Sequence, residues 1–379
     1  MKKLKGVLNN FNDVMEKNSK IYVAGHIGMV GSAITRNLAD NGYTNLVFTP
    51  YPPFDLTDQK IVAAFFEKEK PEYVVLAAAK VGGILSNNKY RAQFIYENLM
   101  IQNNIIHNSY LNGVKKLLFL GSSCIYPREC PQPIKEEYLL TGDLEYTNEP
   151  YAVAKIAGII TCESYNIQYG TNYVSVMPTN LYGPNDNYNL ETSHVLPALI
   201  RKMHLGKCLE NSDWHAIRED LKRYPVEEIN EASSETDIIE KLSKSGIVYS
   251  GNDPLGQSKV TINLWGTGSP YREFLYVDDV AEACVYVLEH VDFKDLVTEG
   301  KPVINTHINI GTGKDLRINE LAQLICRIIG FKGRLNWDSS KPDGTFRKLL
   351  DVSKINQLGW KEKISLEEGI TMVYERYIG

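Results

Sequence analysis

The sequence predicts a doubly wound α/β fold, in which helices cover both faces of a parallel sheet. Three observations support this prediction. Strands alternate with helical stretches from Lys20 to Met177, the strands are apolar throughout, and the first strand runs into three glycines spaced for a tight turn. Strands without alternating polar residues belong in a sheet that is buried on both sides. We therefore expect a parallel sheet as the framework.

The expected elements follow one another in regular order. The first strand is Ile21–Ala24, and the helix after the glycines ends near Asn41-Gly42, a usual helix-ending pair. The next elements are helix Ile61–Lys68, strand Tyr73–Ala77, helix Tyr90–Asn112, strand Lys116–Leu120, helix Tyr151–Tyr169 and strand Tyr173–Met177. Because a helix follows each strand, the chain can return to start the next strand in the same direction.

The glycine turn Gly25-x-x-Gly28-x-x-Gly31 predicts a dinucleotide site. Glycines suit this position because the turn is tight, the backbone must approach a pyrophosphate, and helix and strand must pack closely. The amino end of the following helix then directs its positive dipole end at the phosphates. A strand before the glycines and a helix after them make the motif more specific.

The 379 residues allow two or three domains. We expect an N-terminal extension at residues 1–19, a dinucleotide-binding domain at 20–180, and a mainly substrate-binding lobe at 181–379. Some segments of that lobe are expected to return to the first domain. The polar, acidic stretch at about 209–259 is predicted to be a helical insertion, whose second helix Ser234 would cap. The role of this insertion stays open.

Composition and charge exclude several classes of function. The content of 43% hydrophobic and 23% charged residues excludes a disordered chain. The formal charge of −5 provides no overall positive field for a nucleic acid or a membrane. The basic start of the chain lacks the apolar stretch of a signal peptide. The six cysteines show neither a CxxC pair nor zinc spacing, so we expect a cytoplasmic protein without a metal site.

Tyr151 and Lys155 lie one turn apart on one face of an expected helix. An ammonium beside a phenol favours the phenolate, so we expect the pKa of Tyr151 to move from about 10 toward neutrality. Ser122, Ser123 and Cys124 follow the end of a strand, where doubly wound sheets build their sites. The combination of glycine turn, strand-end serine and Tyr-x-x-x-Lys resembles the extended short-chain dehydrogenase/reductases.

Longer stretches resemble one family of this type, the GDP-L-fucose synthases, which are 3,5-epimerases and 4-reductases of GDP-4-keto-6-deoxymannose. The stretches are VAGHIGMVGSAI, LAAAKVGGI, GSSCIYP, TNEPYAVAKIAG, SVMPTNLYGPNDN, SHVLPALIRK, WGTGSPYREFLYVDD, NIGTGK and SKPDGTFRKLLDVSK. They extend from about Lys20 to the C-terminus, interrupted by the 209–259 insertion. The resemblance implies NADP(H) as cofactor, a GDP-4-keto-6-deoxy sugar as substrate and a homodimer.

Residue by residue, the resemblance implies a complete site. The reductive triad would be Ser122, Tyr151 and Lys155, and the acid/base pair for epimerisation would be Cys124 and His194. The substrate would be held by Lys202, Trp265, Arg272 and Asp343. The cofactor would be lined by Gly25, Gly28, Met29, Val30, Gly31, Asp55, Leu56, Leu120, Gly121, Ser122, Ser123, Tyr151, Lys155, Pro178, Thr179, Asn180, Leu181 and His194.

These residue types suit the implied chemistry. A C4 ketone acidifies the hydrogens on both neighbouring carbons, so one ketone held by serine and tyrosine can serve two epimerisations and then accept a hydride. Cysteine and histidine can exchange protons near neutral pH. Lys202 and Arg272 can pair with a diphosphate, and Trp265 offers a flat surface for a base or sugar.

Two positions depart from the family pattern. Ile27 in the glycine turn and Tyr51 after the second strand stand where the family has basic residues, which are expected to bind the 2′-phosphate of NADP. An acidic residue that would favour NAD is also missing directly after that strand. NADP(H) stays the expected cofactor, and NAD(H) stays open as an alternative.

Other functions also stay open. A C4 reductase, or an epimerase and reductase, of a related GDP-4-keto-6-deoxyheptose in surface polysaccharide biosynthesis would share much of this pattern. The presence of both Cys124 and His194 favours an enzyme that epimerises as well as reduces. A catalytically silent cofactor-sensing module is the alternative from another class. The intact set of Ser122, Tyr151 and Lys155 argues against such a module.

Overall fold

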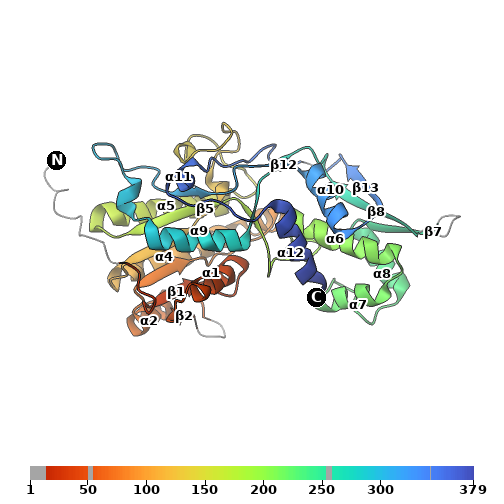
Figure 1. The fold of residues 1–379 in the computed structure, drawn as a ribbon, viewed down its shortest axis with the longest axis horizontal. Coiled ribbons are helices and arrows are strands. Elements are labelled where there is room, and N and C mark those ends of the chain that lie inside the picture. The colour runs from red at the N-terminus through yellow and green to blue at the C-terminus, as the bar shows by residue number, and fades with distance from the viewer. Residues whose placement is uncertain (1–13, 50–53, 253–257, 342) are drawn as a thin grey trace. The chain divides into compact units, whose positions relative to one another are not determined.

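The computed structural model describes residues 14–49, 54–252, 258–341 and 343–379 (Figure 1). The chain divides into two compact units, each built from three separate segments. The first unit comprises Met1–Leu181, Glu273–Lys314 and Leu349–Lys363. The second comprises Tyr182–Arg272, Asp315–Lys348 and Ile364–Gly379.

A six-stranded parallel sheet forms the centre of the first unit, with strand order β11-β5-β4-β3-β1-β2. Its strands are β1 (Ile21–Ala24), β2 (Leu46–Val47), β3 (Tyr73–Leu76), β4 (Lys116–Leu120), β5 (Tyr173–Pro178) and β11 (Ile308–Ile310). Each pairing in this sheet is parallel. The doubly wound fold class is therefore confirmed.

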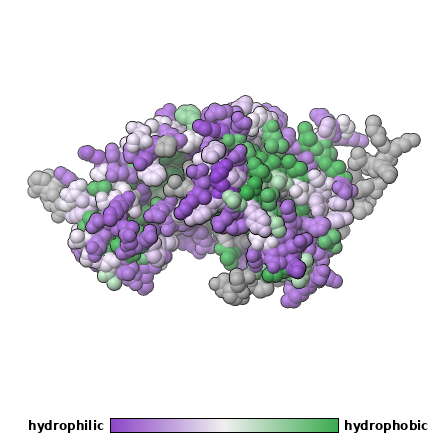
Figure 2. Space-filling view, turned by 180° about the vertical axis from the view of Figure 1, so that it is seen from behind, coloured by the Kyte–Doolittle hydropathy of each residue, from purple (hydrophilic) through white to green (hydrophobic). Residues whose placement is uncertain are grey.

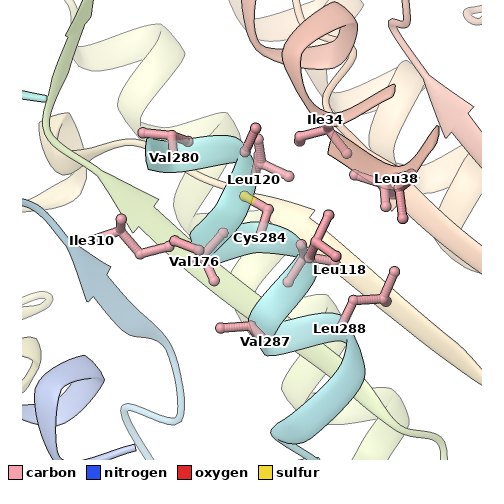
Figure 3. Packing of buried hydrophobic residues seen from close by; sticks show 14 of the residues in the cluster. Ile34, Leu38, Leu118, Leu120, Val176, Val280, Cys284, Val287, Leu288 and Ile310 are labelled. Carbon is pink, nitrogen blue, oxygen red and sulfur yellow. The ribbon is translucent and has the colours of Figure 1, made fainter. Parts of the chain in front are cut away.

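Helices cover both faces of this sheet. One face carries α1 (Met29–Asp40) and α9 (Val277–His290), and the other carries α2 (Gln59–Glu69), α4 (Arg91–Leu111) and α5 (Glu149–Tyr169). Figure 3 shows the first face, where Ile34 of α1, Cys284 of α9 and Val176 of β5 belong to one buried cluster. Alternate residues of each strand enter opposite clusters, which explains why the strands are apolar throughout.

Shorter elements complete the first unit. They are α3 (Ile84–Lys89), α11 (Ser353–Gln357), the 3₁₀ turns η2 (Ser123–Ile125), η3 (Glu136–Tyr138) and η4 (Phe293–Leu296), and the pair of β6 (Asn180–Tyr182) with β10 (Phe274–Tyr276). Residues 1–13 of the expected extension lie outside the described residues. Met15 is buried in the core cluster and Lys17 pairs with Glu289 at 3.3 Å, so residues 14–19 pack onto this unit.

The second unit contains a three-stranded sheet of order β13-β8-β7. Its strands are β7 (Ile247–Asn252), β8 (Ser258–Trp265) and β13 (Arg334–Asp338). Its helices are α6 (Val195–Glu210), α7 (Trp214–Arg223), α8 (Glu235–Lys244), α10 (Ile318–Ile329) and α12 (Leu366–Ile378). The short strands β9 (Tyr271–Arg272) and β12 (Leu316–Arg317) form an antiparallel pair.

The 209–259 segment is not helical throughout. It holds α7 and α8, and the Ser234 side chain accepts from the amide of Asp237, as the capping pattern predicts. The segment then continues as β7, whose residues Ile247–Tyr249 pair antiparallel with Val260–Ile262 of β8. This strand was missed because its register depends on a partner outside the segment.

Polar and charged side chains cover most of the face in Figure 2, and hydrophobic areas on it are smaller. In the part of the chain that the structure describes, no helix is long and apolar enough to cross a membrane.

Candidate active site

The glycine turn connects β1 to α1 in the first unit. Gly25 has a φ of +90°, and a Cβ there would lie 2.8 Å from the Cα of Ala78. A Cβ on Gly31 would lie 2.1 Å from the carbonyl oxygen of Gly25. These two glycines are required by the packing of the turn itself. Met29 and Val30 pack against the core cluster and hold the helix on the sheet.

Gly28 differs from the other two glycines because the fold does not require it. A Cβ on Gly28 would meet only the Gly25 oxygen, at an ordinary 3.5 Å. Gly28 is exposed at the amino end of α1, where no side chain of the described residues caps the helix and the first turn has no acidic residue. An open helix terminus with an exposed glycine fits a pyrophosphate. The residues of this turn therefore fit a dinucleotide.

Other predicted cofactor residues lie at strand ends. A Cβ on Gly121, directly after β4, would lie 2.3 Å from the sulfur of Met177, so glycine is required there. Thr179, after β5, donates its amide to the Ile310 oxygen at 3.0 Å. The Asn180 side chain donates to the Glu273 carbonyl at 2.8 Å. Pro178–Leu181 is thus held by backbone and amide hydrogen bonds at the carboxyl edge of the sheet.

The region expected to meet the ribose is described in part. The Asp55 carboxylate accepts from the amide and hydroxyl of Thr57, and these bonds lower its pKa. The Leu56 carbonyl accepts from Asn104 at 2.9 Å. Ile27 is 76% exposed in the glycine turn, and Tyr51 lies outside the described residues. The packing of the turn therefore imposes no need for an apolar side chain at position 27.

Ser122, Tyr151 and Lys155 come together in the first unit. Ser122 lies between β4 and η2, whereas Tyr151 and Lys155 share one face of the first turns of α5. A hydrogen bond joins the side chains of Tyr151 and Ser122. Lys155 Nζ lies 5.8 Å from the centre of the Tyr151 ring. Ser122 and Tyr151 can therefore direct two hydroxyls at one carbonyl oxygen.

The expected fall in the pKa of Tyr151 is wrong for the ligand-free chain. Burial raises the pKa of Tyr151, and the hydrogen bond from Ser122 opposes this only in part. Lys155 donates its proton to the Leu120 carbonyl at 2.7 Å, and burial lowers its own pKa to about 8. The ammonium is directed at the backbone of β4, so it does not stabilise a phenolate. Tyr151 is therefore a neutral proton donor in this state.

Cys124 belongs to the same part of the first unit. Its side chain is 7% exposed within η2, and its amide donates to Ser122 Oγ at 3.4 Å. A negative charge on Cys124 raises the pKa of both Tyr151 and Lys155, so the thiol lies within electrostatic range of both groups. The structure therefore brings the first member of the predicted epimerisation pair to the reductive triad.

The second member, His194, belongs to the second unit. It is exposed and precedes α6, where its carbonyl accepts from the Ala198 amide at 3.1 Å. The two residues of the predicted pair thus come from different units, and each is placed here within its own.

Arg272 and Asp343 lie near each other in the second unit. The Arg272 guanidinium donates to the carbonyl oxygens of Tyr271 and Thr345, at 2.6 Å each. Asp343 accepts from the amide and hydroxyl of Thr267, at 2.9 and 2.7 Å. The negative charge of Asp343 opposes the lowering of the Arg272 pKa by burial. This guanidinium is therefore anchored on backbone oxygens.

The other two predicted substrate residues belong to the second unit as well. Trp265, at the end of β8, is 64% exposed, and Lys341 Nζ lies 5.6 Å from its ring centre. A Cβ on Gly246 would lie 3.4 Å from Lys202 Nζ, which places the Lys202 ammonium beside the start of β7. Burial lowers the pKa of Lys202, which favours release of its proton when no anion is bound.

Sequence reasoning did not single out Asp186, although it quoted the stretch that contains it. Burial raises the pKa of Asp186 to about 7. Its Oδ1 accepts from the Asn187 amide at 2.7 Å, whereas its Oδ2 is buried and has no hydrogen-bond partner among the described residues. A buried carboxyl of this kind is a candidate functional group. An acidic residue between Asn and Pro turns was the available signal.

Comparisons with known proteins agree with this site. The sequence model of the NAD dependent epimerase/dehydratase family matches residues 21–221 and 246–311. The chain is 48% identical to GDP-L-fucose synthase 1 of Arabidopsis thaliana over 97% of this chain and 95% of that protein. Two solved structures are also similar over 96% of this chain. A GDP-6-OMe-4-keto-L-xylo-heptose reductase from C. jejuni is 47% identical, with 99% of its chain covered and a TM-score of 0.87.

The second structure is MlghC, a GDP-mannoheptose C4 reductase from Campylobacter jejuni with NADP bound. It is 46% identical, with 100% of its chain covered and a TM-score of 0.82. The glycine turn, the Ser-Tyr-Lys set and these alignments over nearly the full length support one conclusion. The chain belongs to the GDP-L-fucose synthases, an enzyme family within the NAD dependent epimerase/dehydratase family.

Proposed function

We propose that this chain is a cytoplasmic NADPH-dependent enzyme that converts GDP-4-dehydro-6-deoxy-D-mannose to GDP-L-fucose. The reaction comprises epimerisation at C3 and C5 followed by reduction at C4. The observation that carries the proposal is the position of Cys124 within electrostatic range of Tyr151 and Lys155. A reductase needs only the hydroxyl and ammonium groups, whereas a thiol beside them adds a group that can exchange a proton with carbon.

In the epimerisations, Ser122 and Tyr151 hydrogen-bond the C4 oxygen and stabilise the negative charge that it gains when a neighbouring carbon loses its proton. One of Cys124 and His194 accepts this proton, and the other donates a proton to the opposite face of the carbon. Each epimerisation therefore takes up one proton and releases one, without oxidation or reduction.

In the reduction, Tyr151 donates its phenol proton to the C4 oxygen. A bound nicotinamide cofactor supplies the hydride that C4 accepts, so the ketone gains one hydride and one proton and becomes an alcohol. Burial keeps Tyr151 protonated before this step. The Lys155 ammonium lies 5.8 Å from the Tyr151 ring centre and stabilises the phenolate that the step leaves behind.

A decisive experiment supplies GDP-4-keto-6-deoxymannose and NADPH in heavy water and examines the product by NMR. Deuterium at both C3 and C5 of GDP-L-fucose is the expected result, because each epimerisation returns a proton from solvent. Reduction without deuterium at these carbons would contradict the epimerase part of the proposal. An inactive protein with this substrate would contradict the whole proposal.

A GDP-4-keto-6-deoxyheptose is the second candidate substrate. Solved heptose reductases at 46–47% identity resemble the chain about as closely as GDP-L-fucose synthase 1 does at 48%. The two candidates are separated by comparing kcat/KM for the hexose and the heptose under the same conditions. A higher value for the heptose would transfer the proposal to that substrate.

We further propose NADPH as the preferred cofactor, because a solved relative at 46% identity has NADP bound. Ile27 provides no positive charge for a 2′-phosphate. The preference therefore depends on other residues, and kcat/KM with NADPH should exceed the value with NADH. Equal values would show that the missing basic side chain has removed the selectivity.

A homodimer is proposed through the outer face of α5. Val153, Ile160 and Ile167 are spaced by seven residues on this helix and are 40%, 44% and 51% exposed. An apolar stripe with this spacing suits packing against another helix. Analytical ultracentrifugation should show a dimer for the natural protein and a monomer for Ile160→Glu. The control Met372→Glu, on α12, should stay dimeric, and a monomeric natural protein would contradict the proposal.

A further inference from the structure

A fully buried arginine lies at the centre of a polar network in the second unit. Arg201 of α6 is 0% exposed. Its Nε and Nη2 donate to Oδ1 of Asp220 in α7, at 3.1 and 2.8 Å. The second carboxylate oxygen of Asp220 accepts from the hydroxyl of Tyr377 in α12. The charged groups are therefore paired and hydrogen-bonded, as burial of charge requires.

The same guanidinium also holds two backbone carbonyls. Arg201 Nη1 donates to the carbonyl oxygen of Tyr188 at 2.9 Å, and Nη2 donates to that of Tyr224 at 2.5 Å. The Tyr188 ring packs against the rings of Tyr224 and Tyr377, with centroids 5.1 and 4.7 Å apart. The rings of Tyr224 and Tyr377 stack at 5.4 Å. A rigid fork of donors thus fixes one point of the chain before α6.

The point that Arg201 fixes lies in the loop that leads to His194. In this loop, Asn189 accepts from the amides of Glu191 and Thr192 through its side chain, at 2.9 and 3.0 Å. The Asn189 carbonyl accepts from the Ser193 amide at 3.0 Å. These local bonds make a compact turn between Tyr188 and His194. Anchoring the Tyr188 carbonyl therefore anchors the turn that ends at His194.

Arg201 and His194 are also linked through α6. They are seven residues apart, which is about two helical turns, so they lie near the same face of the helix. The loop leaves the Arg201 side chain at Tyr188 and rejoins the helix at His194. Helix, loop and guanidinium therefore form a closed ring of contacts around the predicted acid/base residue.

We propose that Arg201 and its partner Asp220 are positioning residues, which set the place of His194 by holding the Tyr188 carbonyl. Asp220 comes from α7, within the 209–259 segment, so this segment contributes to the active site through the Arg201–Asp220 pair. The inference rests on the proposed function for its kinetic readout. A purely structural role would need no such pair, because apolar side chains of similar size stabilise a core equally well or better.

The test compares Arg201→Lys and Asp220→Asn with the natural protein. Lysine keeps the charge of Arg201 and loses the fork that bonds Asp220 and both carbonyls. Deuterium entry at C3 and C5 in heavy water should slow by about 100-fold, the loss expected when a catalytic group moves by about 1 Å. The Kd for NADPH should stay within about twofold, because the glycine turn belongs to the other unit.

The matched control is Glu228→Gln, which removes a negative charge from the same segment. Glu228 pairs with Lys241 at 3.0 Å on the surface, with 70% of its side chain exposed. Deuterium entry in this variant should equal that of the natural protein. A milder variant, Tyr377→Phe, removes one hydroxyl from Asp220 and should give a smaller loss than Asp220→Asn.

Hydrogen exchange of the backbone provides a readout that needs no substrate. Amides of residues 185–193 should exchange faster in Arg201→Lys and Asp220→Asn, whereas amides of the parallel sheet in the first unit should be unchanged. Unchanged exchange in the loop, or full deuterium entry in Arg201→Lys, would overturn the proposal. If the natural protein itself does not epimerise the sugar, the proposed function fails, and loop exchange alone decides the positioning role.

Discussion

The two units hold their functional groups by different physical means. In the first unit, backbone geometry places them: Lys155 donates to the carbonyl of Leu120, and Ser122 follows the end of the same strand. In the second unit, side chains do this work. Arg201 and Asp220, both buried, hold a loop that has no strand beside it in the described residues.

This difference has a consequence for which substitutions each unit tolerates. Parallel strands place their carboxyl ends together regardless of most side chains, so a site on that edge depends on a few groups and on glycines. A loop held by a buried ion pair depends on side chains far along the chain. Changes in the first unit should therefore act at the chemical step, and changes in the second should act through geometry.

The largest expected effect comes from Tyr151→Phe. Loss of the phenol proton donor should lower the rate of C4 reduction by about 1,000-fold, within the range for general acid catalysis. NADPH binding should be retained, because the ring stays. Single-turnover oxidation of NADPH measures the rate. The control Tyr169→Phe, at the far end of α5, should reduce at the natural rate, and an equal loss in both variants would contradict the assignment.

Cys124→Ser tests the thiol of the pair that is divided between the units. Serine does not ionise near neutral pH, so deuterium entry should fall by about 100-fold while NADPH affinity is unchanged. The control Cys130→Ser should epimerise normally. Equal losses of deuterium entry and of NADPH affinity would mean that Cys124 has a structural role.

Two glycines of one turn should respond in opposite ways. A Cβ at position 31 meets the Gly25 oxygen at 2.1 Å, so Gly31→Ala should lower the free energy of unfolding by about 1–3 kcal/mol. Gly28→Ala meets only an ordinary contact of 3.5 Å and should leave the melting temperature nearly unchanged while weakening NADPH binding. Thermal unfolding and titration with NADPH measure the two effects. Normal NADPH affinity in Gly28→Ala would contradict the phosphate site.

The smallest expected effect is a pH dependence from Lys155. Its pKa is lowered to about 8, so its ammonium is lost as the pH rises through 8, and the rate of C4 reduction should fall above that pH. The unfolded chain keeps this lysine protonated until about pH 10.4, so its contribution to the free energy of unfolding should rise between pH 8 and 10.4. Rate profiles and urea unfolding over this range measure both. A flat rate profile to pH 10 would contradict the role of the ammonium.

Much of the first unit could be predicted because its elements are determined locally. The strands Ile21–Ala24 and Lys116–Leu120 have the predicted bounds, and the helix expected from Tyr151 begins two residues earlier, with Pro150 in its first turn. Apolar runs, glycine turns and helix-ending residues act over a few positions. The order of the strands then follows from parallel pairing.

Other features depend on neighbours that are distant in the sequence. The spacing of Tyr151 and Lys155 predicted a lowered tyrosine pKa, but the Leu120 carbonyl binds the ammonium and burial raises the pKa of the phenol. Asp220 reads as one more polar residue of an acidic stretch until Arg201 and Tyr377 surround it. Desolvation and buried pairing are properties of the packed chain, so local patterns do not reveal them.

The sequence by itself determined the doubly wound fold, the dinucleotide turn and the identity of the reductive triad. Each depends on short motifs whose geometry is set by backbone sterics and strand direction. Only the tertiary structure decided where the Lys155 proton goes, which glycine is free to meet a phosphate, and which arginine holds the loop of His194. These properties arise from burial and from contacts between segments that are far apart in the chain, and the free energy of a charge depends on both.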